Sequence, residues 1–205
     1  MTQILQAEAA GAIEQTAVFL KQGQLIVLPT DTVYGVAANA FDGAAVEQLY
    51  VVKKRPLSKP IPVLLADPEA LSLVADGIPS LAQQLIARYW PGALSLIVPK
   101  KASLPEALSP NAGVAVRIPD CPVARAVIRA AGGAVAATSA NLSGEEPALT
   151  AVSAYEALGE QVAAVLDNGP SLGTIASTVI DCLGPTPKII RPGPITEKDL
   201  GQCKK

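Results

Sequence analysis

The chain has 205 residues, a length that fits one domain, and half of them are hydrophobic although only 3% are aromatic. It contains no histidine, and its formal net charge is −2 at pH 7. Proton transfer or metal ligation by imidazole is therefore excluded. The charge balance also lacks the basic excess of a general polyanion binder, although a local basic patch can still bind nucleic acid.

Apolar periodicity and turn residues predict alternating helices and strands. A first helix is expected over residues 7–22, and Asp42 is a suitable N-cap for a helix of about 12 residues that carries Lys53 in its last turn. Further helices are expected to start near residue 67 and to span residues 79–90, 122–131 and 150–158. Strands are expected at residues 25–28, 61–65, 93–98, 114–118, 134–137, 162–166, 177–182 and 187–191. This order predicts an α/β domain with a mixed sheet.

Three cysteines, Cys121, Cys182 and Cys203, show no C-x-x-C spacing. An odd number without metal-type pairing favours a reducing compartment and argues against a zinc site. The chain starts without the apolar core of a signal peptide, and no apolar stretch reaches about 18 residues, the length of a membrane span. We therefore expect a cytoplasmic protein with no membrane contact, in which the cysteines are packing or surface residues.

Four polar clusters lie at the ends of apolar runs, at residues 29–35 (PTDTVYG), 53–60 (KKRPLSKP), 116–119 (VRIP) and 138–144 (TSANLSG). The first and the last directly follow predicted strands. Hydroxyls, an amide and fixed cations at strand ends suit an anionic, oxygen-rich ligand. We expect these clusters to converge on one hollow that binds such a ligand.

The basic cluster has two interpretations. Lys53, Arg55 and Lys59 can surround phosphate oxygens, because arginine offers a planar fork of donors and lysine a point charge. Alternatively, they form a solvated helix end, where the helix dipole favours cations. Pro56 and Pro60 bracket the loop and stiffen it, which favours the first interpretation.

The other polar residues are equally ambiguous from the sequence. Arg117 lies in an otherwise apolar strand, where an arginine needs a partner, either an internal carboxylate or a ligand carboxylate. Ser139 and Asn141 can cap a turn through the local backbone, or they can hold ribose, base or phosphate groups. Asp31 has the same two possibilities. Neither a Walker-type loop nor G-x-G-x-x-G is present, so an ATP site here has to be non-standard.

Seven motifs in order resemble those of the YrdC-like family, whose members include threonylcarbamoyl-AMP synthases. They lie at residues 28–35, 53–56, 89–92, 114–119, 138–144, 177–181 and 190–193. The resemblance covers about residues 10–195. It implies an α/β fold with an open, twisted, mixed parallel and antiparallel sheet, flanking helices and a concave basic face. It also implies a single domain over residues 1–205, without the additional C-terminal domain of longer synthases.

The resemblance implies a nucleotidyltransferase that joins L-threonine, bicarbonate or carbon dioxide, and ATP into threonylcarbamoyl-AMP and pyrophosphate. The product would feed threonylcarbamoyladenosine formation in tRNA by separate partner proteins. Mg²⁺ would accompany the nucleotide, and no protein residue is assigned as a metal ligand. Such a reaction needs no protein nucleophile, so the lack of histidine is no obstacle.

By motif position, the residues that resemble the threonine-binding ones are Thr32, Arg117 and Ser177. Those that resemble the ATP-binding ones are Lys53, Arg55, Lys59, Gly113, Ser139, Asn141, Pro147 and Arg191. Lys53 and Arg55 are the implied catalytic residues, because they would neutralise charge on the phosphates. This sequence departs from the family pattern at two outer positions. Lys59 stands where some members have a polar amide, and Leu64 stands where some have a histidine near threonine.

Two other functions are open at this point. One is an RNA-binding module that uses the basic concave face without catalysis, against which the acidic net charge argues. The other is a non-synthase paralogue of the same family. Such paralogues tend to lose the Ser-x-Asn sequence, which is intact here at residues 139–141.

Overall fold

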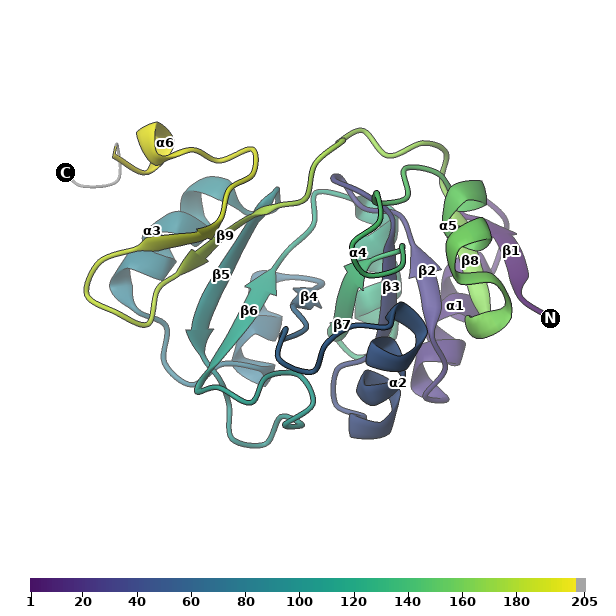
Figure 1. The fold of residues 1–205 in the computed structure, drawn as a ribbon, viewed down its shortest axis with the longest axis horizontal. Helices are drawn as coiled ribbons and strands as arrows, with labels where there is room; N and C mark the ends of the chain where they lie inside the picture. Colours follow the sequence, from purple (N-terminus) through teal and green to yellow (C-terminus); the bar gives the residue numbers. More distant parts are fainter. Residues whose placement is uncertain (202–205) are drawn as a thin grey trace.

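The computed structural model describes residues 1–201, and in that range ten strands form one open sheet that twists along its length (Figure 1). The strands are β1 (Gln3–Gln6), β2 (Ile26–Leu28), β3 (Gly35–Asn39), β4 (Val63–Leu65), β5 (Leu94–Pro99), β6 (Gly113–Arg117), β7 (Ala134–Ser139), β8 (Ala164–Asp167), β9 (Thr178–Asp181) and β10 (Lys188–Arg191). Their order is β1-β8-β2-β3-β7-β4-β6-β5-β9-β10. Because parallel and antiparallel pairs both occur, the predicted α/β class with a mixed sheet is confirmed.

Helices cover both faces of the sheet. They are α1 (Ala12–Lys21), α2 (Gly43–Lys53), α3 (Ser80–Tyr89), α4 (Pro122–Ala130), α5 (Ala151–Leu158) and α6 (Glu197–Gly201), with 3₁₀ turns η1 (Pro68–Leu73) and η2 (Gly159–Gln161). One apolar cluster joins α1 and α4 to Ile26 and Leu28, whereas the other joins α2, α3 and α5 to Val27. Since neighbouring residues of a strand point to opposite faces, β2 is buried on both sides.

The helix that delivers the basic cluster follows the prediction. The carboxylate of Asp42 accepts a hydrogen bond from the backbone N–H of Ala45 at 3.2 Å and caps the start of α2. The helix ends at Lys53, so of the basic residues 53–55 that were expected in its last turn only Lys53 lies in the helix. Lys54 then has the left-handed conformation, with a φ of 50°, and turns the chain into the basic loop.

The start of the chain differs from the prediction. The helix expected over residues 7–22 begins only at Ala12, because Gly11 has a φ of 80° and lies outside the helix. Before it, β1 pairs with β8, and β3 lies between β2 and β7; neither strand is among the predictions. β1 is mostly exposed, and β3 is made largely of glycine and alanine, so both lack the β-branched runs that indicate strands.

The described cysteines are packing residues, as predicted. Cys121 and Cys182 are buried free thiols, and burial raises the pKa of Cys182 to about 11, so it is protonated at neutral pH. Cys203 lies outside the described residues. Within residues 1–201, no helix has the length and hydrophobicity to cross a lipid bilayer.

Strand register places several residues of the polar clusters on one face. Leu64 of β4 is paired with both Arg117 of β6 and Val135 of β7. Residues two apart in a strand point to the same face, so Ala137 and Ser139 continue the row that Val135 begins. Leu64 and Ala137 belong to the cluster covered by α1 and α4. The row therefore runs from that cluster toward the uncovered part of the same face.

Candidate active site

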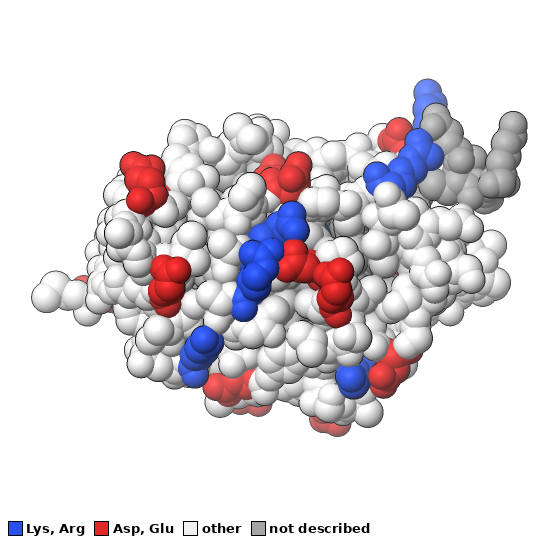
Figure 2. Space-filling model, turned by 180° about the vertical axis from the view of Figure 1, so that it is seen from behind, with Lys and Arg blue, Asp and Glu red and all other residues white. Residues whose placement is uncertain are grey.

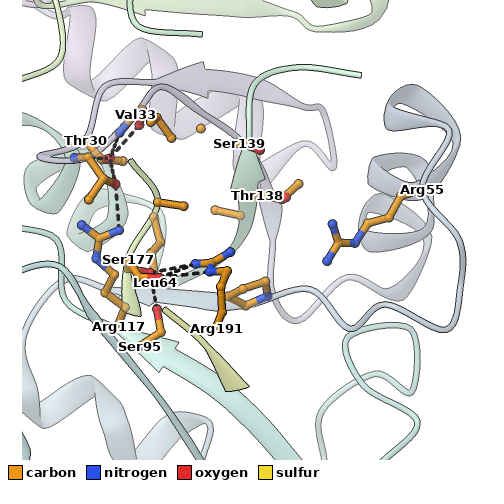
Figure 3. Close-up of a pocket in the computed structure, with 15 residues that line it drawn as sticks. Thr30, Val33, Arg55, Leu64, Ser95, Arg117, Thr138, Ser139, Ser177 and Arg191 are labelled. Atoms are coloured by element: carbon orange, nitrogen blue, oxygen red, sulfur yellow. Dashed lines mark hydrogen bonds between the residues drawn. The ribbon is translucent and has the colours of Figure 1, made fainter. Parts of the chain in front are cut away.

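A hollow with a cavity volume of about 150 Å³ opens over this row (Figure 3). Its lining residues are Thr30, Thr32, Val33, Gly35, Arg55, Pro62, Leu64, Ser95, Arg117, Ala137, Thr138, Ser139, Ala176, Ser177 and Arg191. The volume corresponds to roughly five water molecules and lies below the ~300 Å³ at which pockets for drug-sized ligands begin. The enclosed part therefore suits a molecule the size of an amino acid, and a nucleotide has to extend beyond it.

Arg117 forms the internal ion pair that was one of its two expected roles. Its Nη2 donates to Oδ1 of Asp31 at 2.5 Å, its Nη1 to Oγ1 of Thr32 at 3.0 Å, and its Nε to the carbonyl of Gly92 at 2.8 Å. The side chain is 6% exposed. Burial lowers the pKa of Arg117, and the Asp31 carboxylate opposes that shift, so the guanidinium stays charged. Within residues 1–201 each terminal nitrogen makes one hydrogen bond, which leaves it one N–H for a ligand.

The loop after β2 holds Thr32 against Arg117. Oγ1 of Thr30 accepts hydrogen bonds from the backbone N–H groups of Thr32 and Val33, at 3.1 and 3.2 Å, and donates to the carbonyl of Val33 at 2.6 Å. Thr30, and not Asp31, therefore stabilises this turn. Thr30 is absent from the predicted site residues, although a hydroxyl residue two positions after a buried strand is a typical turn signal.

A second arginine holds Ser177. Arg191 of β10 donates from Nε and Nη2 to the carbonyl of Ser177, at 3.0 and 2.8 Å, and from Nη2 to its Oγ at 3.1 Å. Oγ of Ser95, in β5, lies 2.8 Å from Oγ of Ser177. Burial lowers the pKa of Arg191, and the charges of Arg117 and Arg55 lower it further. The three guanidinium groups therefore face one space, as Figure 3 shows.

Arg55 reaches the hollow from the basic loop. Its Nε donates to the carbonyl of Lys59 and its Nη2 to the carbonyl of Pro60, both at 2.9 Å, which folds the loop back on itself. Arg55 points toward the hollow from the side opposite Arg117 (Figure 3). The side chain of Lys59 is exposed and does not line the hollow.

Lys53 is buried in the protein and does not line the hollow. It is 1% exposed, and its Nζ donates to the carbonyl of Ser139, to the carbonyl of Asn141 at 2.5 Å and to Oδ1 of Asn141 at 3.2 Å. All three ammonium protons thus have protein acceptors, so direct contact with phosphate, as expected from the motif, is not the geometry observed. Burial, and then the charge of Arg55, lowers the pKa of Lys53 to about 8.

Two roles were considered for Ser139 and Asn141, capping a turn and contacting a ligand, and the structure separates them. Asn141 caps the turn, because its Nδ2 donates to the carbonyls of Leu142 and Glu145 at 2.9 and 2.7 Å. Ser139 lines the hollow. Of the expected peripheral residues, Pro147 does not line it, and neither does Gly113. Gly113 lies at the end of β6 away from Arg117, where an added Cβ would be 2.7 Å from Ile97.

Ser95 is a further lining residue that sequence reasoning missed. It is 2% exposed and stands among leucine, isoleucine and valine in β5. A single serine in a buried apolar strand needs a hydrogen-bond partner, and that requirement was the available signal. Its partner, Ser177, comes from a segment more than eighty residues away.

The family of the chain follows from comparison with known proteins. The Sua5/YciO/YrdC family model, described as telomere recombination, matches residues 18–193. The chain belongs to this family. The threonylcarbamoyl-AMP synthase of Bacillus subtilis is 41% identical to it over 193 residues, which are 92% of this chain and 55% of that protein. A relative from Mycobacterium tuberculosis is 41% identical over 184 residues, 89% of this chain and 84% of its own length.

Solved structures of Sua5 and YciO share the fold. The crystal structure of Pyrococcus abyssi Sua5 complexed with L-threonine matches with a TM-score of 0.94 and 32% identity, over all of this chain and 61% of that one. Escherichia coli YciO matches with a TM-score of 0.85 and 26% identity, over 94% of this chain and 96% of that one. This chain therefore spans little more than half of its longer Sua5 relatives and nearly all of YciO.

Proposed function

We propose that this chain is a threonylcarbamoyl-AMP synthase, a nucleotidyltransferase that joins L-threonine, bicarbonate or carbon dioxide, and ATP into threonylcarbamoyl-AMP and pyrophosphate. The name of the Bacillus subtilis relative and the threonine complex of Sua5 support it. One observation in this chain carries the proposal. Arg55, Arg117, Ser139 and Ser177 come from four separate segments and line the same hollow.

The chemistry of such a reaction suits a site made of cations and hydroxyls. The threonine ammonium group loses a proton to solvent, and the neutral amine adds to carbon dioxide to form a carbamate, with release of a second proton to solvent. A carbamate oxygen then attacks the α-phosphorus of ATP, and pyrophosphate leaves. Neither step uses a protein nucleophile. What the protein has to supply is proximity of the two reactants and stabilisation of the negative charge that develops on the phosphates. The absence of histidine in this chain is compatible with that requirement.

We place threonine in the enclosed part of the hollow and ATP toward Arg55. The two free N–H groups of Arg117 form a bidentate pair with the threonine carboxylate. Arg55 and Arg191 each retain an unused Nη1 among the described residues, and these face the phosphates together with the hydroxyl of Ser139. Lys53 acts as a positioning residue, because it holds the backbone at the end of β7, where Ser139 lies.

The described side chains do not form a metal cage. Within residues 1–201, no three His, Cys, Asp or Glu residues are grouped so that they could hold an ion. We propose that Mg²⁺ arrives with ATP, held by phosphate oxygens and water, and we assign it no step on the protein. We also propose that this chain acts in the cytoplasm and passes its product to separate proteins that modify tRNA.

The test is pyrophosphate release from ATP, measured with and without threonine and with and without bicarbonate, together with mass spectrometry of the adenylate. Release that needs both co-substrates and yields threonylcarbamoyl-AMP is the expected result. Salt-sensitive RNA binding without ATP turnover would support the RNA-binding alternative instead. On the face shown in Figure 2, basic side chains lie beside acidic ones, and no broad basic surface is seen there.

A further inference from the structure

A long connection crosses the sheet beside the hollow. Residues 168–177 join the end of β8 to the start of β9, and β2, β3, β7, β4, β6 and β5 lie between these two strands in the described sheet. Figure 1 shows the connection running from one half of the sheet to the other. At Gly173 it touches the loop after β2, because an added Cβ there would lie 2.6 Å from the carbonyl oxygen of Asp31 and 2.8 Å from Cα of Thr32. Its last two residues line the hollow, so the connection follows the edge of the hollow from Thr32 to Ser177.

Both ends of this connection are fixed by hydrogen bonds. The carbonyl of Gly169 accepts from the hydroxyl of Tyr34, a buried residue, at 2.6 Å. The backbone N–H of Ser171 donates to the carbonyl of Leu149 at 2.8 Å. At the other end, the arginine of β10 and the serine of β5 hold Ser177, as described above. Movement of the connection is therefore confined to the residues between Ser171 and Ser177.

The strap, residues 172–176, lies between these fixed points. In the part of the chain that the structure describes, neither its backbone nor its side chains form a hydrogen bond. Two of its side chains are large and apolar, and Leu172 is 94% exposed and Ile175 55% exposed. A segment of this kind moves at low cost, because no hydrogen bond has to break. Its apolar side chains gain free energy only when another surface covers them.

The proposed reaction makes species that water destroys, and the role of the strap rests on that proposed function. Water that attacks the carbamoyl carbon of threonylcarbamoyl-AMP breaks its bond to the phosphate oxygen. The products are AMP and the carbamate, which takes up a proton, loses carbon dioxide and leaves threonine. The enclosed part of the hollow is only about 150 Å³, so the anhydride lies toward the open mouth. Closing the active site is a way to keep water from such an intermediate.

We propose that the strap closes over the bound substrates and that Leu172 and Ile175 then cover the mouth of the hollow against water. Ser171 and Ser177 are the fixed points between which the strap moves, so closure needs no change in the sheet. The bound nucleotide and amino acid supply the surface that the two side chains bury. The ligands themselves therefore favour the closed state.

Hydrogen exchange of the backbone amides of residues 172–176 measures closure directly. Wild-type protein is compared with and without L-threonine and α,β-methylene-ATP, an analogue whose α–β bridge the reaction cannot break, and binding of both is measured by titration calorimetry. We expect exchange in the strap to slow about tenfold when both ligands are bound. Binding without slower exchange would overturn closure and leave the proposed function intact. Absence of binding would contradict the proposed function, and closure with it.

A variant that carries both Leu172→Ser and Ile175→Ser tests the cover. The ratio of AMP to threonylcarbamoyl-AMP, measured by mass spectrometry at early times, should rise about three- to tenfold, because water reaches the anhydride. Pyrophosphate release should stay within about twofold of the wild type, because the groups that bind the phosphates are unchanged. The control is Val51→Ser, a 75% exposed position in α2, which should change neither quantity; hydrolysis in solution affects all three proteins equally. An unchanged ratio, with or without slower pyrophosphate release, would overturn the role of the two side chains.

Discussion

Replacing Lys53 with methionine tests whether this lysine positions the site from inside the protein. Methionine has a similar length and no charge, so Lys53→Met removes the ammonium group and keeps most of the packing. The carbonyls of Ser139 and Asn141 and Oδ1 of Asn141 then lose their common donor. We expect a less stable protein in which Ser139, at the end of β7, and the loop that follows it are displaced.

Two opposing terms set the size of this effect. Three acceptors lose their donor, and at about 1–3 kcal/mol for each buried unpaired group their sum is about 6 kcal/mol. Against this, the variant no longer buries a charge. A fall in the pKa of Lys53 from 10.5 to about 8 corresponds to about 3 kcal/mol against the buried ammonium. The difference is about 3 kcal/mol, or roughly 6–12 °C in the unfolding midpoint of a chain of this length.

Thermal unfolding and steady-state kinetics together measure both consequences. Below the unfolding midpoint, Lys53→Met should bind threonine normally, because the hydrogen bonds of Arg117 do not involve the loop after β7, but should release pyrophosphate far more slowly. Lys54→Met is the matched control, since this neighbouring lysine is exposed, and it should change stability by less than about 0.5 kcal/mol. Wild-type stability and turnover in Lys53→Met would refute the positioning role.

Three further changes test other parts of the structure. Arg55→Ala should lower threonine-dependent pyrophosphate release by about 10²–10³, as when one electrostatic donor is lost from an active site, while the fold stays intact by circular dichroism; near-normal release would remove Arg55 from the phosphates. Arg117→Ala leaves Asp31 as an unpaired, largely buried charge, so it should destabilise the protein by about 3 kcal/mol in urea unfolding and raise the KM for threonine; an unchanged KM would place threonine elsewhere. Arg129, and then Arg125, hold the pKa of Asp67 at about 2, below its usual 3.8. Because the folded-state pKa is depressed, this stabilisation is present above about pH 4 and is lost as the pH falls toward 2. Asp67→Asn should therefore remove about 1 kcal/mol of acid-dependent stability, allowing for partial exposure of the group, when urea unfolding at pH 6 and pH 3 is compared; identical pH dependence in the variant and the wild type would contradict this.

Local signals in the sequence were sufficient for the parts of the fold that depend on neighbours in the chain. The Asp42 cap and the helix length placed Lys53 at the end of α2. A strand arginine needs a partner, and Arg117 has one. β1 and β3 could not be found in this way, because both are strands only through pairing with distant segments.

The sequence also could not predict the direction in which each polar side chain points. Lys53, Lys54 and Arg55 are consecutive, and the sequence pattern treats them as one basic cluster. In the structure Lys53 is buried under the loop after β7, Lys54 is exposed, and Arg55 lines the hollow. Which of the three turns inward depends on the backbone carbonyls of Ser139 and Asn141, about ninety residues further on, and no local rule contains that information.

The three guanidinium groups at the hollow are held by carbonyls of the backbone before any ligand arrives. Arg55 is fixed by Lys59 and Pro60, Arg117 by Gly92, and Arg191 by Ser177. Burial is the main cause of the lowered pKa of Arg191, and the charges of Arg117 and Arg55 lower it further, so the three groups repel one another in the fold. A bound phosphate or carboxylate relieves that repulsion without ordering any side chain, so little binding energy is lost to conformational entropy. A site of this kind can bring ATP and an amino acid together by fixed charge alone, which is what a chain without histidine has available.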